Sequence, residues 1–189
     1  MVRQLLAGLR LLVVITVLVG LAYPLAMTGI GQLAFHARAN GSLVHPGGRA
    51  VGSVLLGQPF VGAAWFLPRP SAAGSGYDAL ASGGSNLGPS SLQLRASVDA
   101  ARAAAASADG VRPADVPPDA VTASGSGLDP DISPAYAYQQ VDRAAAARGL
   151  PSDEVRRLVT AHISGRTLGF LGEPRVNVLE LNLALARAR

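Results

Sequence analysis

The stretch that decides the fold is LLVVITVLVGLAYPLAMTGIGQLAF, residues 11–35, which contains no charged side chain. As a helix it would be roughly 38 Å long, whereas the hydrocarbon core of a bilayer is about 30 Å thick. It therefore predicts a transmembrane anchor helix within residues 1–35, with a span of about 11–33. A cleaved signal peptide is the alternative, but its apolar core usually covers only roughly 7–15 residues. Because apolar residues continue past Pro24 and LAMTG is a poor cleavage site, a retained anchor is favoured.

The charges beside this stretch predict its orientation. Arg3 and Arg10 precede it on a short arm that contains no acidic residue. Positive charge is retained on the cytoplasmic side of membranes, so the N-terminus is predicted to be cytoplasmic. The remainder of the chain would then form an extracytoplasmic domain of a single-pass protein in the cell membrane (the inner or plasma membrane).

The anchor contains features that can pack against another helix. Thr16 and Gly20 are small residues four apart, and Pro24 follows at the same spacing and disturbs the carbonyl of Gly20. Such features are tolerated where neighbouring protein satisfies the backbone. Thr16, Gly20 and Pro24 are therefore candidates for helix packing in the membrane, and a lone anchor with ordinary membrane glycines is the alternative.

The composition excludes several kinds of site. The chain has 16 basic and 12 acidic residues, a formal net charge of +4 and no cysteine, and every basic residue is an arginine. Disulfides, thiolate metal sites and a phosphate-binding lysine are therefore excluded. The positive charge is too small and too evenly spread for a nucleic-acid surface.

The residues after the anchor, 36–189, predict one mixed α/β domain with long ordered loops. Glycine-bracketed Val and Leu residues at 48–60 favour a strand or bent strand, and the segment 166–178 is expected to be extended. Helices are expected at 90–108, capped by Ser90 or Ser91; at 134–148, capped by Ser133; after Ser152, which would be the cap; and at 179–189.

Two glycine-rich loops precede helices and are candidate anion sites. ASGGSNLGPSS, 81–91, and SGSGLDPDIS, 124–133, would present backbone N–H groups, but neither follows the pattern of a dinucleotide loop. Structural turns are favoured over phosphate binding. Gln139, Gln140 and Arg143 are the side chains expected nearest to whatever the second loop binds.

Other catalytic arrangements are weaker. The three histidines lack helical ligand spacing, so no metal site is expected. Asp129 and Asp131 are interpreted as turn and capping residues rather than as a calcium loop or a carboxylate pair. Ser85 or Ser126 could be combined with His162 as a nucleophile and base, but no nucleophile-elbow motif supports this, and catalytic residues are expected to be absent.

The order of the motifs resembles a known family. GQPF is followed by a tryptophan and RPSA, then by YDALASGGSNLGP, SGSGLDPDISPA and finally GRTLGFLGEPRVNVLELNLAL. In this order the chain resembles the KdpC subunit of the bacterial Kdp potassium-transporting ATPase, over nearly its whole length. The polyalanine stretch at 101–108 and the absence of lysine depart from the family without affecting a motif.

The resemblance implies a non-catalytic accessory subunit of an ATP-driven, high-affinity potassium uptake complex. Its partners would be a potassium-translocating subunit, a P-type ATP-hydrolysing subunit and a small stabilising peptide. It would stabilise the assembly and act as a catalytic chaperone that raises the affinity of the hydrolysing subunit for ATP. The nucleotide-contact candidates carried over by motif are Ser124, Gly125, Ser126, Gly127 and Gln140, and potassium is expected to be transported rather than bound here.

The predicted orientation conflicts with direct ATP contact, because it places residues 36–189 away from cytoplasmic ATP. We expect the topology to hold and any effect on ATP affinity to be indirect. The alternative function is an extracytoplasmic domain that gates or feeds potassium into the transporter without any nucleotide contact.

Overall fold

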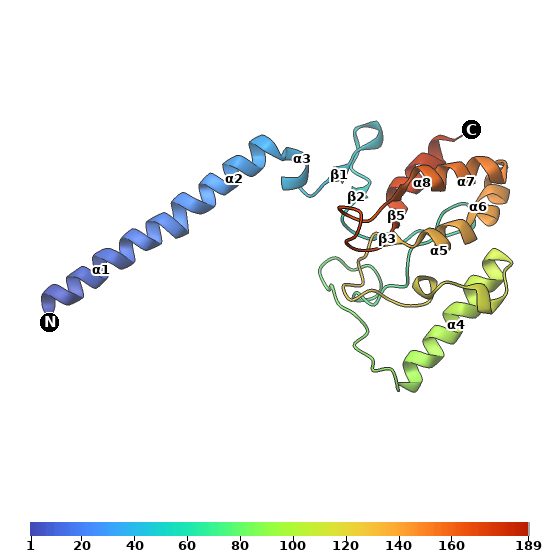
Figure 1. Cartoon of the computed structure of the whole chain (residues 1–189), viewed down its shortest axis with the longest axis horizontal. Helices are drawn as coiled ribbons and strands as arrows, with labels where there is room; N and C mark the ends of the chain where they lie inside the picture. The colour runs from blue at the N-terminus through green and yellow to red at the C-terminus, as the bar shows by residue number, and fades with distance from the viewer. Residues whose placement is uncertain (189) are drawn as a thin grey trace. The chain divides into compact units, whose positions relative to one another are not determined.

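The structure is a computed structural model in which residues 1–188 are described. It divides into two compact units, residues 1–43 and the residues from 44 onward (Figure 1). The first unit is almost entirely helical, whereas the second contains helices and two small sheets. The predicted fold class, one apolar N-terminal helix followed by a mixed α/β domain, is confirmed.

The first unit contains one long apolar helix. Val2–Ala34 is continuous over 33 residues, with a mean hydropathy of 2.5 and no buried part, and by length and composition it can cross a membrane. Its parts are α1 (Val2–Val17), the π-helical turn η1 (Leu18–Ala22) and α2 (Tyr23–Ala34), and the short α3 (His36–Ala39) follows.

The π-helical turn has a cause in the sequence. Pro24 has no N–H to donate to the carbonyl of Gly20, so an ordinary helical hydrogen bond is missing there. Instead the N–H of Tyr23 donates to the Leu18 carbonyl, five residues earlier. The helix therefore continues through Pro24 with one widened turn rather than ending at it.

The helices of the second unit begin and end at residues that satisfy their terminal backbone groups. Ser91, Ser133 and Asn177 each accept a hydrogen bond from a backbone N–H of the helix that follows. The helices are α4 (Leu92–Asp109), α5 (Pro134–Gln139), α6 (Val141–Arg148), α7 (Ser152–Ala161) and α8 (Val178–Arg187), with single 3₁₀ turns at η2 (Pro46–Gly48), η3 (Pro113–Asp115) and η4 (Pro118–Ala120).

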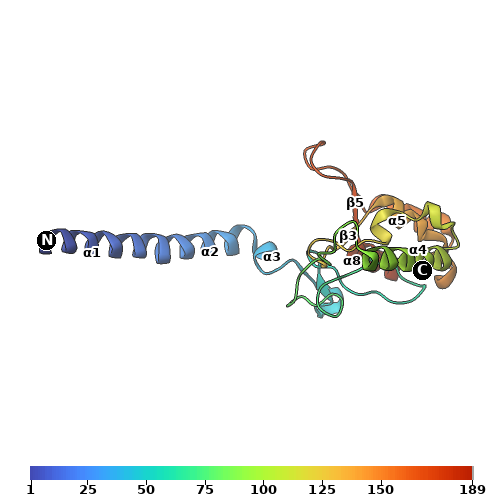
Figure 2. The same ribbon diagram turned by 90° about the horizontal axis from the view of Figure 1, so that it is seen from below.

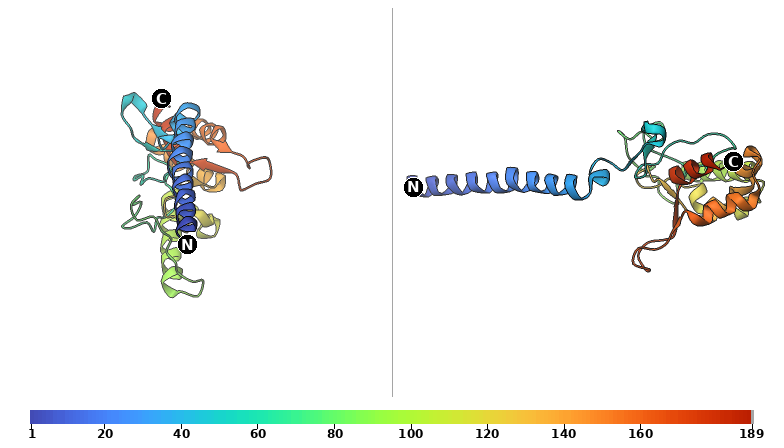
Figure 3. Two further views of the ribbon diagram at one scale, coloured as in Figure 1. Left: turned by 90° about the vertical axis from the view of Figure 1, so that its left-hand side faces the viewer. Right: turned by 90° about the horizontal axis from the view of Figure 1, so that it is seen from above.

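The strands are short and form two sheets. β1 (Leu43–Val44) pairs with β2 (Gly52–Ser53), and β3 (Asp131–Ile132), β5 (Arg175–Asn177) and β4 (Ile163–Ser164) form an antiparallel sheet in that order. Val176 lies opposite both Ile132 and Ile163 and is fully buried. The segment that joins β4 to β5 extends from the body of this unit (Figures 2 and 3).

Four local predictions are wrong. The segment 166–178, expected to be extended, turns tightly at residues 168–170 and forms a strand only at Arg175–Asn177. Within 48–60 only Gly52–Ser53 is a strand, because the backbone turns at residues 53–56 and Gly57 N–H then bonds to the Leu128 carbonyl. The helix expected at 134–148 is interrupted at Gln140, which ends α5 and begins α6. The cap of α7 is Pro151, and Ser152 is already helical.

The core lies between the helices and the three-stranded sheet. α6 packs on α7, α7 packs on α8, and α4 contacts α6. Its largest fully buried apolar side chains come from the loop before α4, from three helices and from one strand: Phe66, Val141, Val155, Val159, Val176, Leu181 and Leu185. Burial of such side chains is the main favourable term in folding, at about 25 cal/mol per Å² of apolar surface.

The segment 63–67 begins as a turn at Ala63 and Ala64 and then brings Phe66 into this core without a strand partner. The side-chain amide of Asn182 accepts from the Phe66 N–H at 2.8 Å and donates to the Phe66 carbonyl at 2.9 Å. Gln140 repeats the pattern on the next residue: its Oε1 accepts from the Leu67 N–H at 2.6 Å and its Nε2 donates to the Leu67 carbonyl at 3.1 Å. We call these two amides, with the arginines below, the side-chain clamp.

Two arginines of α6 bind the preceding carbonyls. Arg143 Nη1 donates to the carbonyls of Ala63 and Trp65, and Arg148 Nε donates to that of Ala64 at 2.7 Å. Arg143 also forms a buried ion pair of 2.7 Å with Asp109 at the end of α4. Since backbone groups that leave water must be paired, the clamp supplies the hydrogen bonds that the half-buried and buried residues 64–67 would obtain from a neighbouring strand in a sheet.

The clamp predicts a large stability difference between two glutamines. Gln140→Ala leaves the N–H and carbonyl of Leu67 without their partners and should lower the free energy of unfolding by about 2–4 kcal/mol. Gln93→Ala, on the exposed face of α4, is the control and should change it by less than about 0.5 kcal/mol. Denaturant unfolding of the full chain in detergent measures both, and equal effects would contradict the clamp.

Candidate functional site

The two glycine-rich loops found in the sequence lie against each other. Gly83 N–H donates to the Ser126 carbonyl at 2.8 Å, and Ser82 Oγ donates to the same oxygen at 3.0 Å. A Cβ at Gly84 would lie 3.2 Å from the Gly125 carbonyl oxygen. The loops thus contact through their backbones, which explains why both contain glycine.

Gly127 fixes the closest part of this contact. It has φ of +67°, and a Cβ there would lie 2.6 Å from Ala73 N and 2.7 Å from the Gly83 carbonyl oxygen. Its own carbonyl accepts a hydrogen bond of 2.6 Å from Ser71 Oγ. A side chain at this position would meet both backbone strain and a clash.

The hydroxyls of the same loop are used internally. Ser126 Oγ accepts from the Leu128 N–H at 3.1 Å and lies 3.3 Å from Ser124 Oγ. Gly125 is exposed. The candidate nucleotide-contact residues 124–127 therefore form a bent structural loop whose contacts are made to neighbouring loops.

Gln140, the fifth candidate, is fully buried in the clamp. Its neighbours have the same kind of role, since Gln139 Nε2 and Arg143 Nε each donate to the Asp109 carboxylate at 2.7 Å. Among residues 1–188 no hydrogen bond joins these side chains to the loop 124–127. These side chains therefore bind Asp109 and the backbone of Leu67, and their contact with a ligand of the loop 124–127 stays a prediction.

The membrane candidates Thr16, Gly20 and Pro24 lie along the apolar helix, where all three are exposed. A Cβ at Gly20 would be in ordinary contact, 3.8 Å, with the methyl group of Thr16. These positions thus present a face on which small side chains would let another helix approach closely.

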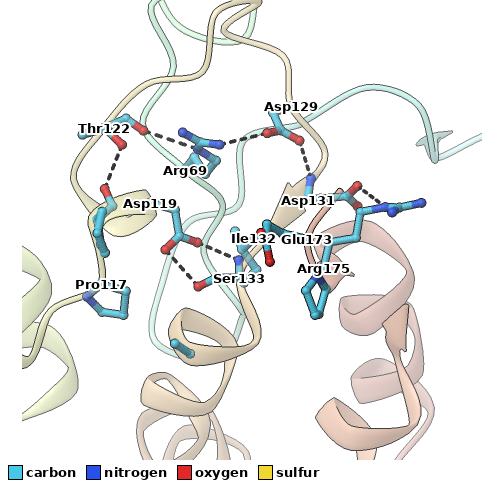
Figure 4. A pocket seen from close by; sticks show the side chains of 13 residues that line it. Arg69, Pro117, Asp119, Thr122, Asp129, Asp131, Ile132, Ser133, Glu173 and Arg175 are labelled. Carbon is cyan, nitrogen blue, oxygen red and sulfur yellow. Dashed lines mark hydrogen bonds and ion pairs between the residues drawn. The ribbon is translucent and has the colours of Figure 1, made fainter. Parts of the chain in front are cut away.

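Beside the packed loops lies a cleft of about 600 Å³. Arg69 crosses it, with Nη1 3.0 Å from Asp129 Oδ2 and Nε 3.4 Å from the Thr122 carbonyl oxygen (Figure 4). Asp129 Oδ1 accepts from the Asp131 N–H at 3.0 Å, which confirms the predicted turn role of Asp129. The cleft is lined by Arg69, Pro117, Pro118, Asp119, Thr122, Asp129, Asp131, Ile132, Ser133, Ala135, Glu173, Pro174 and Arg175.

The other carboxylates of the cleft have distinct partners. Asp131 pairs with Arg175 Nε at 3.0 Å, yet burial, followed by the nearby charge of Asp129, raises the pKa of Asp131 above its usual value. Asp119 accepts from the N–H of Ser133 at 2.6 Å and from its hydroxyl at 2.9 Å, both visible in Figure 4. No arginine within residues 1–188 forms an ion pair with Asp119.

Tyr77 connects the cleft to the loops. Its hydroxyl donates to the Arg69 carbonyl, and its N–H donates to Ser71 Oγ at 2.8 Å. Burial raises the pKa of Tyr77 to about 12, so the hydroxyl remains a donor at neutral pH. Arg69 is thus held from its backbone as well as from its side chain.

The lining of the cleft is rich in charged side chains. Two arginines against four carboxylates leave the cleft lining with a formal charge of −2. His162 Nδ1 lies 2.8 Å from the Leu158 carbonyl oxygen of its own helix. In the part of the chain that the structure describes, no group of three acidic or histidine side chains is placed to hold a metal.

The cleft was not predicted from the sequence. Its charged residues come from four separate stretches, near 69, 119, 129–131 and 173–175. The only local signal was Asp129-Pro-Asp131, which indicates a turn. The pairing of β3 with β5, which brings Asp131 beside Arg175, is a long-range contact that no local pattern specifies.

Comparison with known proteins gives one consistent result. The family described as KdpC, the K+-transporting ATPase c chain, matches residues 5–187. A protein of Kineococcus radiotolerans, the "Potassium-transporting ATPase KdpC subunit", is 59% identical over 100% of this chain and 95% of its own length. Proteins of the same description from Mycobacterium bovis (54% identical, 98% of each chain) and Myxococcus xanthus (55%, 96% of this chain and 87% of the other) are also similar.

The family match covers the anchor helix, both glycine-rich loops, the cleft and the last helix. The relatives are more than half identical over nearly the whole chain. The chain therefore belongs to the KdpC family.

Proposed function

We propose that this chain is a non-catalytic accessory subunit of an ATP-driven, high-affinity potassium uptake complex. It stabilises the assembly and acts as a catalytic chaperone that raises the affinity of the P-type ATP-hydrolysing subunit for ATP. Support comes from membership of the KdpC family and from the description of the relatives as subunits of a potassium-transporting ATPase. The other partners are a potassium-translocating subunit and a small stabilising peptide.

We infer that the chain affects ATP affinity without binding ATP, because the loop 124–127 makes its hydrogen bonds to neighbouring loops. Its Ser126 carbonyl accepts from Gly83 and Ser82, and its Gly127 carbonyl accepts from Ser71. Gln140 is enclosed in the clamp. ATP is therefore held by the hydrolysing subunit, and this chain changes its affinity through protein contacts; potassium is transported by the complex and not retained here.

The orientation fits this indirect route. The apolar helix Val2–Ala34 serves as a single-pass anchor in the cell membrane. Arg3 and Arg10 keep the N-terminus in the cytoplasm, and the folded domain lies on the extracytoplasmic side. The domain then contacts the outer face of the potassium-translocating subunit.

A second candidate function uses the same orientation. The cleft lining has a formal charge of −2, and an electronegative surface raises the local concentration of cations. A domain of this kind gates or feeds potassium into the transporter without affecting ATP. Removal of the chain should change the KM of the complex for ATP under the first function, and its KM for potassium under the second.

The ATP route is tested with the complex and with the chain alone. Hydrolysis by the complex should show a lower KM for ATP when this chain is present, while the full chain alone in detergent should show no saturable binding of labelled ATP. If saturable binding is found, the chain is itself a nucleotide-binding module. If the KM for ATP is unchanged but that for potassium shifts, the second candidate replaces the first.

The orientation is tested by labelling a single introduced thiol. The chain has no cysteine, so Leu92→Cys at the exposed start of α4 gives one reactive position. A membrane-impermeant maleimide should label it in intact spheroplasts. Labelling only after the membrane is permeabilised would place the domain in the cytoplasm and reject the proposed orientation.

The helix face is tested by increasing the size of one glycine. Gly20→Leu fills the face formed with Thr16 and Pro24, so partner subunits should be retained less well on purification of the tagged chain. Gly29→Leu is the control, since Gly29 lies roughly on the opposite face of the helix and has nothing within 4 Å of its added Cβ. Equal retention by both variants would mean that the anchor does not pack through this face.

A further inference from the structure

The segment between β4 and β5, residues 165–174, forms an ordered arm. Thr167 and Leu171 pair as an isolated bridge, with both N–H groups donating to the opposite carbonyls at 2.9 Å. Gly169 N–H also donates to the Arg166 carbonyl at 3.1 Å. Figures 2 and 3 show the arm extending from the body of the domain.

The tip of the arm is apolar and exposed. Leu168 is 80% exposed, Phe170 69% and Leu171 50%. Leu168 has φ of +54°, a conformation that costs a residue with a Cβ about 1–2 kcal/mol. A tight turn, closed by the bridge, therefore presents three large apolar side chains to the surroundings, of which Leu168 and Phe170 are the most exposed.

The base of the arm is charged and joins the cleft. Arg166 pairs with Glu173 at 2.7 Å, and Arg175 pairs with Asp131 at 3.0 Å. Glu173 and Arg175 line the cleft, whose formal charge is −2, and counting Arg166 leaves −1. An apolar tip is thus followed by an electronegative surface at its base.

The negative charge at the base of the arm favours a protein partner over a lipid surface. Loops that insert into bilayers are usually accompanied by free basic residues that meet anionic headgroups. Both arginines of the arm's base are already paired, and the surface beside them is negative. A rigid aromatic tip with a charged base instead fits a protein surface with an apolar pocket and a basic rim.

We propose that the arm is a docking element, which inserts Leu168 and Phe170 into an apolar pocket of a partner subunit while a basic residue of that partner enters the cleft. The proposal rests on the proposed function, since the partner is a subunit of the same complex. The tip supplies the anchors, and the cleft sets the orientation in which they dock.

The experiment uses Leu171→Cys, which keeps both anchors and adds a single thiol at the tip. The thiol reacts with N-ethylmaleimide only where water reaches it. The rate of labelling is compared between the intact complex and the full chain alone, both in vesicles of phosphatidylethanolamine and phosphatidylglycerol. Leu92→Cys, at an exposed position of α4, is the control and should react equally in both.

The thiol introduced by Leu171→Cys is expected to lose most of its reactivity in the complex and to react freely in the chain alone. Protection in both samples would show that the tip inserts into the bilayer, and free reaction in both would show that it stays in water. Either result overturns the docking. If the unaltered chain copurifies with no other subunit, both the proposed function and the docking fail. If a complex forms but the thiol at its tip still reacts freely, only the docking fails.

A polar substitution gives an independent measure. Asparagine tolerates the left-handed conformation of Leu168, so Leu168→Asn removes the apolar anchor without disturbing the turn. Retention of partner subunits by the tagged chain should fall by about tenfold or more, because removal of a central anchor residue weakens an interface by about that factor. Leu92→Asn changes a leucine of similar exposure, 82%, and should retain them fully; equal retention by both would reject the docking.

Discussion

The fold of the domain depends on one requirement, that the backbone of residues 63–67 be hydrogen-bonded although it enters the core beside helices. An extended segment in a sheet obtains these bonds from a neighbouring strand, but here side chains of Gln140, Asn182, Arg143 and Arg148 supply them. The arrangement fixes Phe66 at the centre of the core, because the bonds hold the backbone on both sides of it. It also ties α6 and α8 together through a segment that precedes both by more than seventy residues.

The clamp explains why the chain around Gln140 departs from a regular helix. A continuous helix over 134–148 satisfies every local rule, since Ser133 caps it, Pro134 begins it and alanines follow. The break at Gln140 separates α5 from α6, and the side chain at the break binds both backbone groups of Leu67. Tertiary hydrogen bonds there outweigh helix propensity, which is worth less than about 1 kcal/mol per residue.

The sequence predicted features that depend on neighbours along the chain. The apolar N-terminal helix and the caps at Ser91 and Ser133 follow from spacing within a few residues. It did not predict that the two loops pack together, that Arg69 reaches Asp129, or that Asp131 lies beside Arg175. Those contacts join residues 44 to 60 positions apart, and no local pattern encodes such pairings.

The position of Trp65 has a practical consequence. It is the chain's single tryptophan, Arg148 lies 4.3 Å over its ring, and its carbonyl is bound by Arg143. A guanidinium so close to the indole affects its emission, and both arginines belong to the clamp. The fluorescence of Trp65 should therefore report whether the segment 63–67 is bound by the clamp, without any added label.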